Sequence, residues 1–321
     1  MPVPTFQEAI EVAAVDSHTY RANLSPEWCI GTVPHGGYVT AVFMRVASQH
    51  FVGTLSKQRQ PHTITLHLEF LRRTQAGPAI FTVQDIKLGQ QTSTIHVSLK
   101  QDDREEVVGY ITNANLQTES GVSLQTRFSL DPLPAPVDVS KLRQDADAHW
   151  ELQTRMPFPE FRKAATKVTF FFPRDGHPHR SMNDEWITFQ NGERFTNESI
   201  GYAADMWPQL VENYREISPY DGQKTKRNEE GKTPKVSLPA RLWYPTLLLN
   251  LDIKKALPEE GVEWLFLRVQ AKTIKNGRLD LEVIILDETG DIVALSHHVS
   301  FVLSAERNTA ARKPTTDGSK L

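Results

Sequence analysis

A pattern of one buried helix followed by four strands occurs twice in this 321-residue chain, and this repeat constrains the fold more than any other feature. In the first copy, Tyr38 to Phe51 predicts a helix that is apolar on most sides, and such a helix is buried rather than laid on a surface. The strands after it alternate with a period close to two. They span 62–70, 79–88, 93–101 and 106–113. This order indicates an α+β fold in which an antiparallel sheet wraps around a long helix.

The second copy repeats the same order of elements. Strands are expected at 167–172 and 185–190, a helix from 197, and four later strands at 240–253, 264–274, 279–286 and 292–303. Matching strand positions lie roughly 185 residues apart, but the two helices lie only about 165 apart, so about 20 extra residues follow the second helix. They fall within 216–239, which is rich in Lys, Glu, Asn and Gly. We interpret this run as a surface insertion, either without a role or placed as a lid over a site.

The repeat divides the chain into four parts. We expect an N-terminal unit at 1–117, a surface linker rich in Pro, Asp and Gln at 118–164, a C-terminal unit at 165–304 and a flexible polar tail at 305–321. The tail ends in Ser319-Lys320-Leu321, the tripeptide that the peroxisomal import receptor reads. Unless this tripeptide is a coincidence, the predicted location is the peroxisome and the receptor is a partner; otherwise the protein is expected to be cytoplasmic.

Composition excludes several classes of function. A net charge of -3 provides no basic patch of the kind that nucleic acid requires, and no apolar run approaches the length of a membrane span. Cys29 is the one cysteine, so no intrachain disulfide is expected, and we interpret it as a buried structural thiol. His177 and His179 lack further residues at metal-ligand spacing, and no nucleotide-binding motif is present. We therefore expect no metal and no cofactor.

Asp205 lies at the margin of the apolar face of the predicted helix 197–210, and Pro208 is expected to kink or end that helix. A carboxylate beside an apolar face and a helix break is an unusual placement. It indicates either a partly solvated helix residue or a functional acid.

Three stretches give the chain a resemblance to the acyl-CoA thioesterase II family, which includes peroxisomal members. They are His35-Gly36-Gly37-Tyr38, Ile200-Gly-Tyr-Ala-Ala-Asp205 and Gly290-Asp-Ile-Val-Ala-Leu-Ser-His-His298. The resemblance implies a double hotdog, with two antiparallel sheets each wrapped around a long central helix. It also implies hydrolysis of acyl-CoA or related acyl thioesters, in lipid metabolism, by a homodimer or higher homo-oligomer.

The resemblance also implies which residues do the chemistry. The family's catalytic Asp falls on Asp205, its Thr or Ser on Thr246, and its Gln on His298, where this chain departs from the family. The corresponding positions of the first copy cannot form an acid–base cluster, so one unit is expected to do the chemistry while the other completes the pocket. Those positions are Thr40 or Ala41, Pro61 and Asn113.

These residues suit attack of water on a thioester. Burial of Asp205 is expected to make its carboxylate a stronger base, and the hydroxyl of Thr246 would hold both carboxylate and water. The leaving thiolate needs little acid assistance. Unpaired N–H groups at the helix start, from Gly36, Gly37 and Tyr38, would bind the developing oxyanion.

The remaining candidates have two interpretations each. Strand alternation places His298 on a polar face with Ser296 and Ser300, either as a plain structural or solvent-facing histidine or as a replacement for Gln that adds an ionisation. Arg72-Arg73 and the lysines between 224 and 235 would bind the phosphates of CoA or are solvated charges. A hotdog dehydratase or isomerase acting on a polyketide-like thioester, and a non-catalytic acyl-binding protein, are the alternative functions.

Overall fold

The computed structural model describes residues 3–207, 210–215 and 241–310. The expected insertion at 216–239, the kink at Pro208 and the C-terminal tripeptide lie outside these residues. Among the residues that the structure describes, no helix combines the length and the apolar character that crossing a membrane requires.

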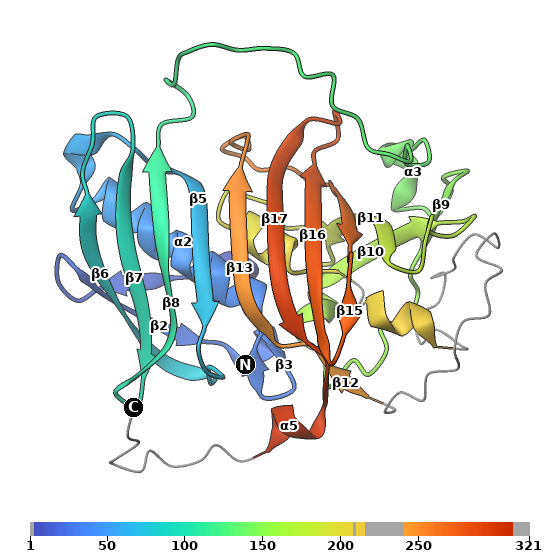
Figure 1. Ribbon diagram of the computed structural model, residues 1–321, viewed down its shortest axis with the longest axis horizontal. Helices are drawn as coiled ribbons and strands as arrows, with labels where there is room; N and C mark the ends of the chain where they lie inside the picture. Colours follow the sequence, from blue (N-terminus) through green and yellow to red (C-terminus); the bar gives the residue numbers. More distant parts are fainter. Residues whose placement is uncertain (1–2, 208–209, 216–240, 311–321) are drawn as a thin grey trace.

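Fourteen strands form one antiparallel sheet that runs through both copies of the repeat (Figure 1). In the first unit its strands are β1 (Val12–Ala14), β2 (Thr19–Leu24), β5 (His62–Phe70), β6 (Gly77–Lys87), β7 (Ser93–Gln101) and β8 (Arg104–Ala114). In the second they are β9 (Trp150–Leu152), β10 (Val168–Pro173), β11 (Met182–Phe189), β13 (Thr246–Ile253), β14 (Leu265–Gln270), β15 (Ile274–Lys275), β16 (Arg278–Leu286) and β17 (Ile292–Phe301). Two short pairs lie apart from the sheet: β3 (Cys29–Ile30) with β4 (Val33–Pro34), and β12 (Leu242–Trp243) with β18 (Leu303–Ser304).

The strand order confirms the repeat. The first unit reads β2-β6-β7-β8-β5 and the second, in mirrored order, β11-β14-β16-β17-β13. The two expected sheets are one, because β5 pairs with β13, with Leu66 opposite Leu251. The edge strands β5 and β13, which could have paired with a second chain, therefore pair with each other within this chain. The expected homo-oligomer stays a prediction.

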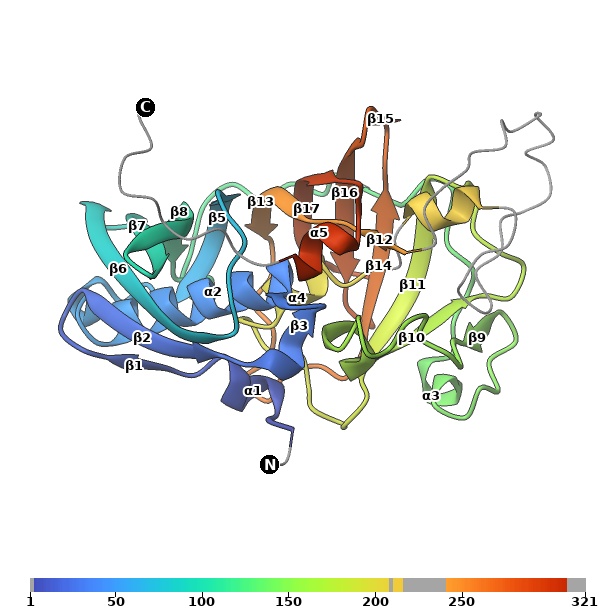
Figure 2. The same ribbon diagram turned by 90° about the horizontal axis from the view of Figure 1, so that it is seen from below.

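The helices differ from expectation in length. Helix α2 (Gly36–Val52) extends past both ends of the predicted helix and is mostly buried, and β6, β2 and β1 curl around it (Figure 2). Helix α4 (Ile200–Ala204) has only five residues, ends at Asp205, and is followed by the 3-10 turn η4 (Leu210–Tyr214). The prediction of a long second helix is therefore wrong. The remaining short helices are α1 (Phe6–Ala9), α3 (Val139–Leu142), α5 (Glu306–Thr309), η1 (Pro26–Trp28), η2 (Ser56–Gln58) and η3 (Ala164–Lys167).

The two repeat helices cross where each has a glycine. A Cβ on Gly37 would lie 2.8 Å from the carbonyl oxygen of Tyr202, and one on Gly201 would lie 3.1 Å from the amide nitrogen of Ala41. Only hydrogen atoms fit at these contacts, so the glycines allow the N-terminal end of α2 to meet the end of α4 at backbone distance.

The linker and the tail both depart from expectation. The linker crosses one end of the sheet (Figure 1), contributes α3 and the edge strand β9, and buries Trp150 against Phe266 on the outer face. The tail is docked as far as Ala310, because Asn308 in α5 is fully buried and its side chain donates to the carbonyl of Ile30 at 2.7 Å. The C-terminal segment therefore closes back onto the first unit.

Candidate active site

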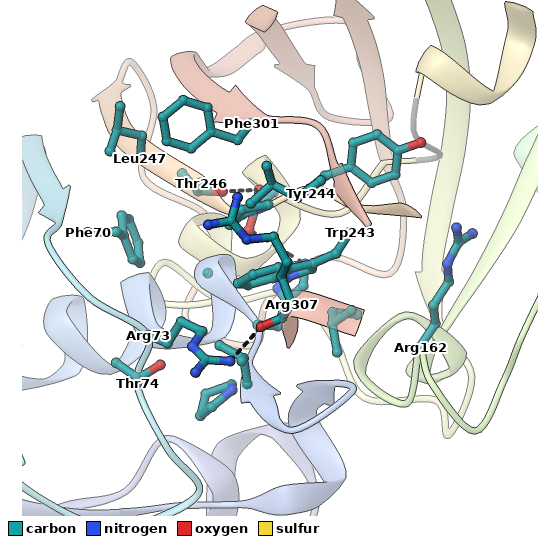
Figure 3. A pocket seen from close by; sticks show the side chains of 18 of the residues that line it. Phe70, Arg73, Thr74, Arg162, Trp243, Tyr244, Thr246, Leu247, Phe301 and Arg307 are labelled. Carbon is teal, nitrogen blue, oxygen red and sulfur yellow. Dashed lines mark hydrogen bonds and ion pairs between the residues drawn. The ribbon is translucent and has the colours of Figure 1, made fainter. Parts of the chain in front are cut away.

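A cavity of about 710 Å³ lies between the two units, beside the N-terminal end of α2 (Figure 3). Most of its wall is apolar, and its polar lining includes Gly36, Asp205 and Thr246. Its aromatic residues are Phe70, Phe161, Phe170, Trp207, Trp243, Tyr244 and Phe301. A cavity of this size, with a few polar groups converging in an apolar wall, is typical of a small-molecule site.

The carboxylate of Asp205 is held from both sides. The backbone N–H of Gly37 donates to its Oδ2 at 2.7 Å, and the hydroxyl of Thr246 donates to its Oδ1 at 3.4 Å. The side chain is only 7% exposed. Asp205 reaches this place because α4 ends there, with Asp205 itself at the C-cap, whereas Thr246 is the first residue of β13. The structure therefore brings together two residues that are 41 positions apart.

Two histidines complete the surroundings of this carboxylate. His35 Nε2 lies 3.5 Å from Oδ2, and His298 Nδ1 lies 3.5 Å from Oδ1. His35 is the N-cap of α2 and lines the cavity, whereas His298 lies behind Asp205 in β17 and is fully buried. The solvent-facing interpretation of His298 is wrong, because the polar face of β17 turns inward and His297 is the exposed neighbour.

The pKa of Asp205 moves in the direction opposite to the expected one. Burial favours the protonated carboxyl, but the charges of protonated His35 and His298, the hydrogen bond that Nδ1 of a protonated His298 donates, and the hydrogen bond from Gly37 outweigh it and lower the pKa. Burial, opposed by Asp205, lowers the pKa of His35, so its ring is neutral near pH 7. Asp205 is therefore an ionised carboxylate held by donors. Desolvation raises the pKa as expected, but the surrounding donors reverse its effect, so the prediction that Asp205 is a stronger base is wrong.

Hydrogen bonds around Ser296 fix the orientation of the His298 ring. The Ser296 hydroxyl lies 2.6 Å from the carbonyl of Asn250 and 2.8 Å from His298 Nε2. A hydroxyl has one proton and a carbonyl can only accept, so Ser296 donates to Asn250 and accepts from Nε2–H. In the neutral ring, Nδ1 then directs a lone pair at Asp205 Oδ1. This contact is unfavourable until a proton arrives between the two atoms.

The three residues expected to bind an oxyanion differ from one another. The amide of Gly37 is already bonded to Asp205, so the expectation that it is unpaired is wrong. Tyr38 is buried in the core, where its hydroxyl donates to the carbonyl of Ala9 at 2.7 Å. Gly36 lines the cavity, and within the described residues its amide has no recorded acceptor. Gly36 is thus the donor that remains at the helix start.

The sequence predicts no role for His35, although this residue begins the stretch His35-Gly36-Gly37-Tyr38. Its position directly before the predicted helix could have indicated a role, because the amides at that helix start lie at the site. The expectation for the first unit agrees with the geometry. Asn113, the counterpart of His298, is fully buried and has only neutral partners: it accepts from Thr63 Oγ1 at 3.1 Å and donates to the carbonyl of Gln60.

The arginines at the cavity have different tasks. Arg73 donates to the backbone carbonyl of Arg307, at 2.6 Å, and to that of Asn308, which fastens α5 over the cavity (Figure 3). Arg72 donates to the carbonyl of Glu105. Both arginine side chains therefore bind backbone carbonyl groups, and neither is merely a solvated charge. Arg307 is exposed and also lines the cavity.

Known proteins resemble this chain over nearly its whole length. The family model for the acyl-CoA thioesterase N-terminal domain matches residues 24–114, and that for the acyl-CoA thioesterase C-terminal domain matches residues 136–302. The thioesterase-like protein TwmA of Talaromyces wortmannii is 36% identical over 340 residues, covering 98% of this chain and 96% of that protein.

Two solved structures share the fold. An acyl-CoA thioesterase II, TesB2, of Mycobacterium marinum superposes with a TM-score of 0.60 at 16% identity, covering 97% of this chain and 99% of the other. A conserved hot dog protein of Alicyclobacillus acidocaldarius has a TM-score of 0.69 at 12% identity, with coverages of 94% and 99%. The architecture is therefore a double hotdog, with the two hotdog units joined in one sheet.

Proposed function

Because the chain belongs to the acyl-CoA thioesterase family, we propose that it hydrolyses acyl thioesters to free acid and thiol by water that Asp205 activates. The observation that carries this proposal is the carboxylate at the cavity wall, where Gly37 donates to Oδ2, Thr246 donates to Oδ1, and Nδ1 of His298 lies 3.5 Å from Oδ1. A thioester needs water placed on its carbonyl carbon and a route for the proton that the water loses.

The proposed reaction begins with a water that lies beside the carboxylate and donates one hydrogen bond to Asp205 Oδ1 and one to the hydroxyl oxygen of Thr246. As the water oxygen bonds to the carbonyl carbon, its proton moves to Asp205 and onward to Nδ1 of His298. That transfer converts an unfavourable lone-pair contact into a hydrogen-bonded ion pair. A carboxylate with a lowered pKa can therefore serve as a base, because it is not the final holder of the proton.

The N-terminal end of α2 supports the second half of the reaction. The developing oxyanion accepts a hydrogen bond from the amide of Gly36, where the helix dipole favours negative charge. Collapse of the tetrahedral intermediate breaks the carbon–sulfur bond. A thiol has a pKa near roughly 8.5, so the thiolate leaves without a strong acid and takes up a proton afterwards. His35 Nε2 lies 3.5 Å from Asp205 Oδ2, so a proton on this nitrogen would help to keep the carboxylate in position.

The cavity wall indicates the parts of the substrate. An apolar acyl group would lie among aromatic side chains such as Trp207 and Tyr244, where its burial is favourable. The anionic groups of a CoA thiol would lie at the exposed end, near Arg307. Binding there favours an acyl-CoA over a neutral thioester.

Thiol release from a panel of acyl-CoA esters tests this function. We expect hydrolysis by the wild type and a loss of about 100-fold or more in Asp205→Asn, the usual contribution of a general base. Asp252→Asn is the matched control, because Asp252 lies on the same strand as Thr246 but points outward with a half-exposed side chain. Turnover without thiol release would indicate a dehydratase or isomerase, and binding without turnover an acyl-binding protein.

We also propose a peroxisomal location, supported by Ser319-Lys320-Leu321. A fluorescent protein fused to the N-terminus of the full chain should accumulate in peroxisomes. Deleting the three residues should leave it in the cytosol. An unchanged distribution would reject the proposal.

A further inference from the structure

Two imidazoles and one carboxylate converge at the far end of the first unit, away from the cavity. His18 comes from the turn between β1 and β2, His50 from the last turn of α2, and Asp85 from β6. The β1–β2 turn is the blue loop at the left of Figure 2. His50 lies 14 positions after Gly36, so the cluster is about 21 Å from the active site along the helix axis.

We propose that His18, His50 and Asp85 form a binding site for a divalent transition metal, best suited to Zn²⁺, that clamps these three elements together. One nitrogen from each ring and one oxygen of the carboxylate lie within 4.8 Å of one another. His18 Nε2 is 3.3 Å from Oδ2 of Asp85, and His50 Nε2 is 3.0 Å from Oδ1.

These separations fit a tetrahedral ion. Zinc–nitrogen and zinc–oxygen bonds are about 2.0–2.2 Å long, which places neighbouring ligands of a tetrahedral ion about 3.3–3.6 Å apart. The two nitrogen–oxygen distances, 3.3 and 3.0 Å, run to different oxygens of Asp85, so small movements of the side chains would bring both rings and one oxygen around a single ion. Two imidazoles and a carboxylate are also ligands that zinc accepts.

The second nitrogen of each ring is held by a hydroxyl. Ser17 Oγ lies 2.8 Å from Nδ1 of His18, and the hydroxyl of Tyr20 lies 3.0 Å from Nδ1 of His50. Without a metal, each ring donates from Nε2 to Asp85, and the hydroxyl donates to Nδ1. With a metal on Nε2, the ring carries its proton on Nδ1 instead, and the same hydroxyl oxygen accepts a hydrogen bond from Nδ1–H. Both states are satisfied because a hydroxyl can donate or accept.

Burial leaves one side of the cluster open. The side chain of His50 is fully buried, that of Asp85 is 25% exposed and that of His18 is 42% exposed. An ion can therefore enter from solvent beside His18 and keep a water as its fourth ligand. The turn that carries His18 is already ordered, because the His18 amide donates to Asp16 Oδ1 at 2.8 Å and Thr54 Oγ1 donates to the carbonyl of Ser17. Asp16 adds a second negative charge beside the entrance.

The test uses the full chain after treatment with a chelator, titrated with Zn²⁺ by calorimetry and followed by thermal unfolding. We expect one equivalent to bind and Tm to rise, because an ion that binds only the folded state stabilises it. Co²⁺ should give the visible absorption of a tetrahedral site. Tyr20→Phe should weaken Zn²⁺ binding by about 10–100-fold, as expected for loss of a hydrogen bond to a metal ligand.

His18→Gln should weaken binding more than Tyr20→Phe, and His297→Gln, at an exposed histidine on the other unit, should leave it unchanged. His18 is partly exposed, so its variant is expected to fold, and Tm in chelator verifies this. Absence of binding, or equal binding by wild type and His18→Gln, would overturn the site. Thiol release should be the same with and without Zn²⁺, so the outcome is independent of the proposed hydrolase function.

Discussion

Replacement of Gly37 by alanine should impair the active site through geometry alone. The new Cβ would lie 2.7 Å from Cβ of Asp205 and 2.8 Å from the carbonyl oxygen of Tyr202. Ordinary contact begins near 3.4 Å, so α2 and the end of α4 must separate by about 0.7 Å. The hydrogen bond from Gly37 to Asp205, now 2.7 Å long, would then exceed the normal range of 2.7–3.2 Å.

The size of the effect follows from that displacement. A shift of about 1 Å in a catalytic group costs roughly 100-fold, so we expect kcat/KM for thiol release to fall by about 10–100-fold. Overpacking should also lower the free energy of unfolding by about 1–3 kcal/mol. Gly53→Ala, at the opposite end of α2, is the control for the helix itself. A Gly37→Ala enzyme that folds and retains kcat/KM within about twofold would refute the reasoning.

Three further predictions concern single side chains. His298→Gln should lower kcat for thiol release, because an amide cannot take up the proton that Asp205 passes on; an unchanged kcat would reject the role of His298. Arg307→Gln should raise KM for acyl-CoA esters and leave it unchanged for thioesters of a small neutral thiol; equal changes for both would place Arg307 outside CoA recognition. Burial, and then the charge of Asp184, raises the pKa of the Glu185 carboxyl, whose oxygens have no hydrogen-bond partner in the described structure. The folded state therefore keeps a proton that the unfolded state loses above about pH 4.5, so stability falls as pH rises from that value toward the folded pKa. Glu185→Gln should raise Tm more at about pH 8 than at about pH 4, and an equal gain at both would contradict this.

Much of the fold follows from local periodicity. The strand His62–Phe70 was predicted with its observed bounds, and the buried helix at Tyr38–Phe51 within two residues of its ends, because alternation and all-round apolarity are properties of contiguous sequence. The second helix was predicted too long. Its apolar spacing continues past Asp205, but the chain turns there to place the carboxylate at the end of α2. That turn depends on contacts with the other unit, which periodicity does not contain.

The part of the site that the resemblance to a known family covers could be predicted from the sequence. The carboxylate of Asp205 meets the hydroxyl of Thr246 and the ring of His298, as the resemblance implies. The lowered pKa of Asp205 could not be predicted from the sequence, because it depends on the two histidine rings that the fold places beside the carboxylate. The docking of α5 could not be predicted either, since the burial of Asn308 depends on contacts with residues more than 270 positions away.

The most direct measurement of the central claim is free-thiol release by Asp205→Asn, which keeps the size of the side chain and removes its charge. If Asp205 activates water, the folded variant should retain acyl-CoA binding and lose about 100-fold or more of kcat, while Asp252→Asn keeps full activity. A folded Asp205→Asn protein that releases thiol at the wild-type rate would show that another group activates the water.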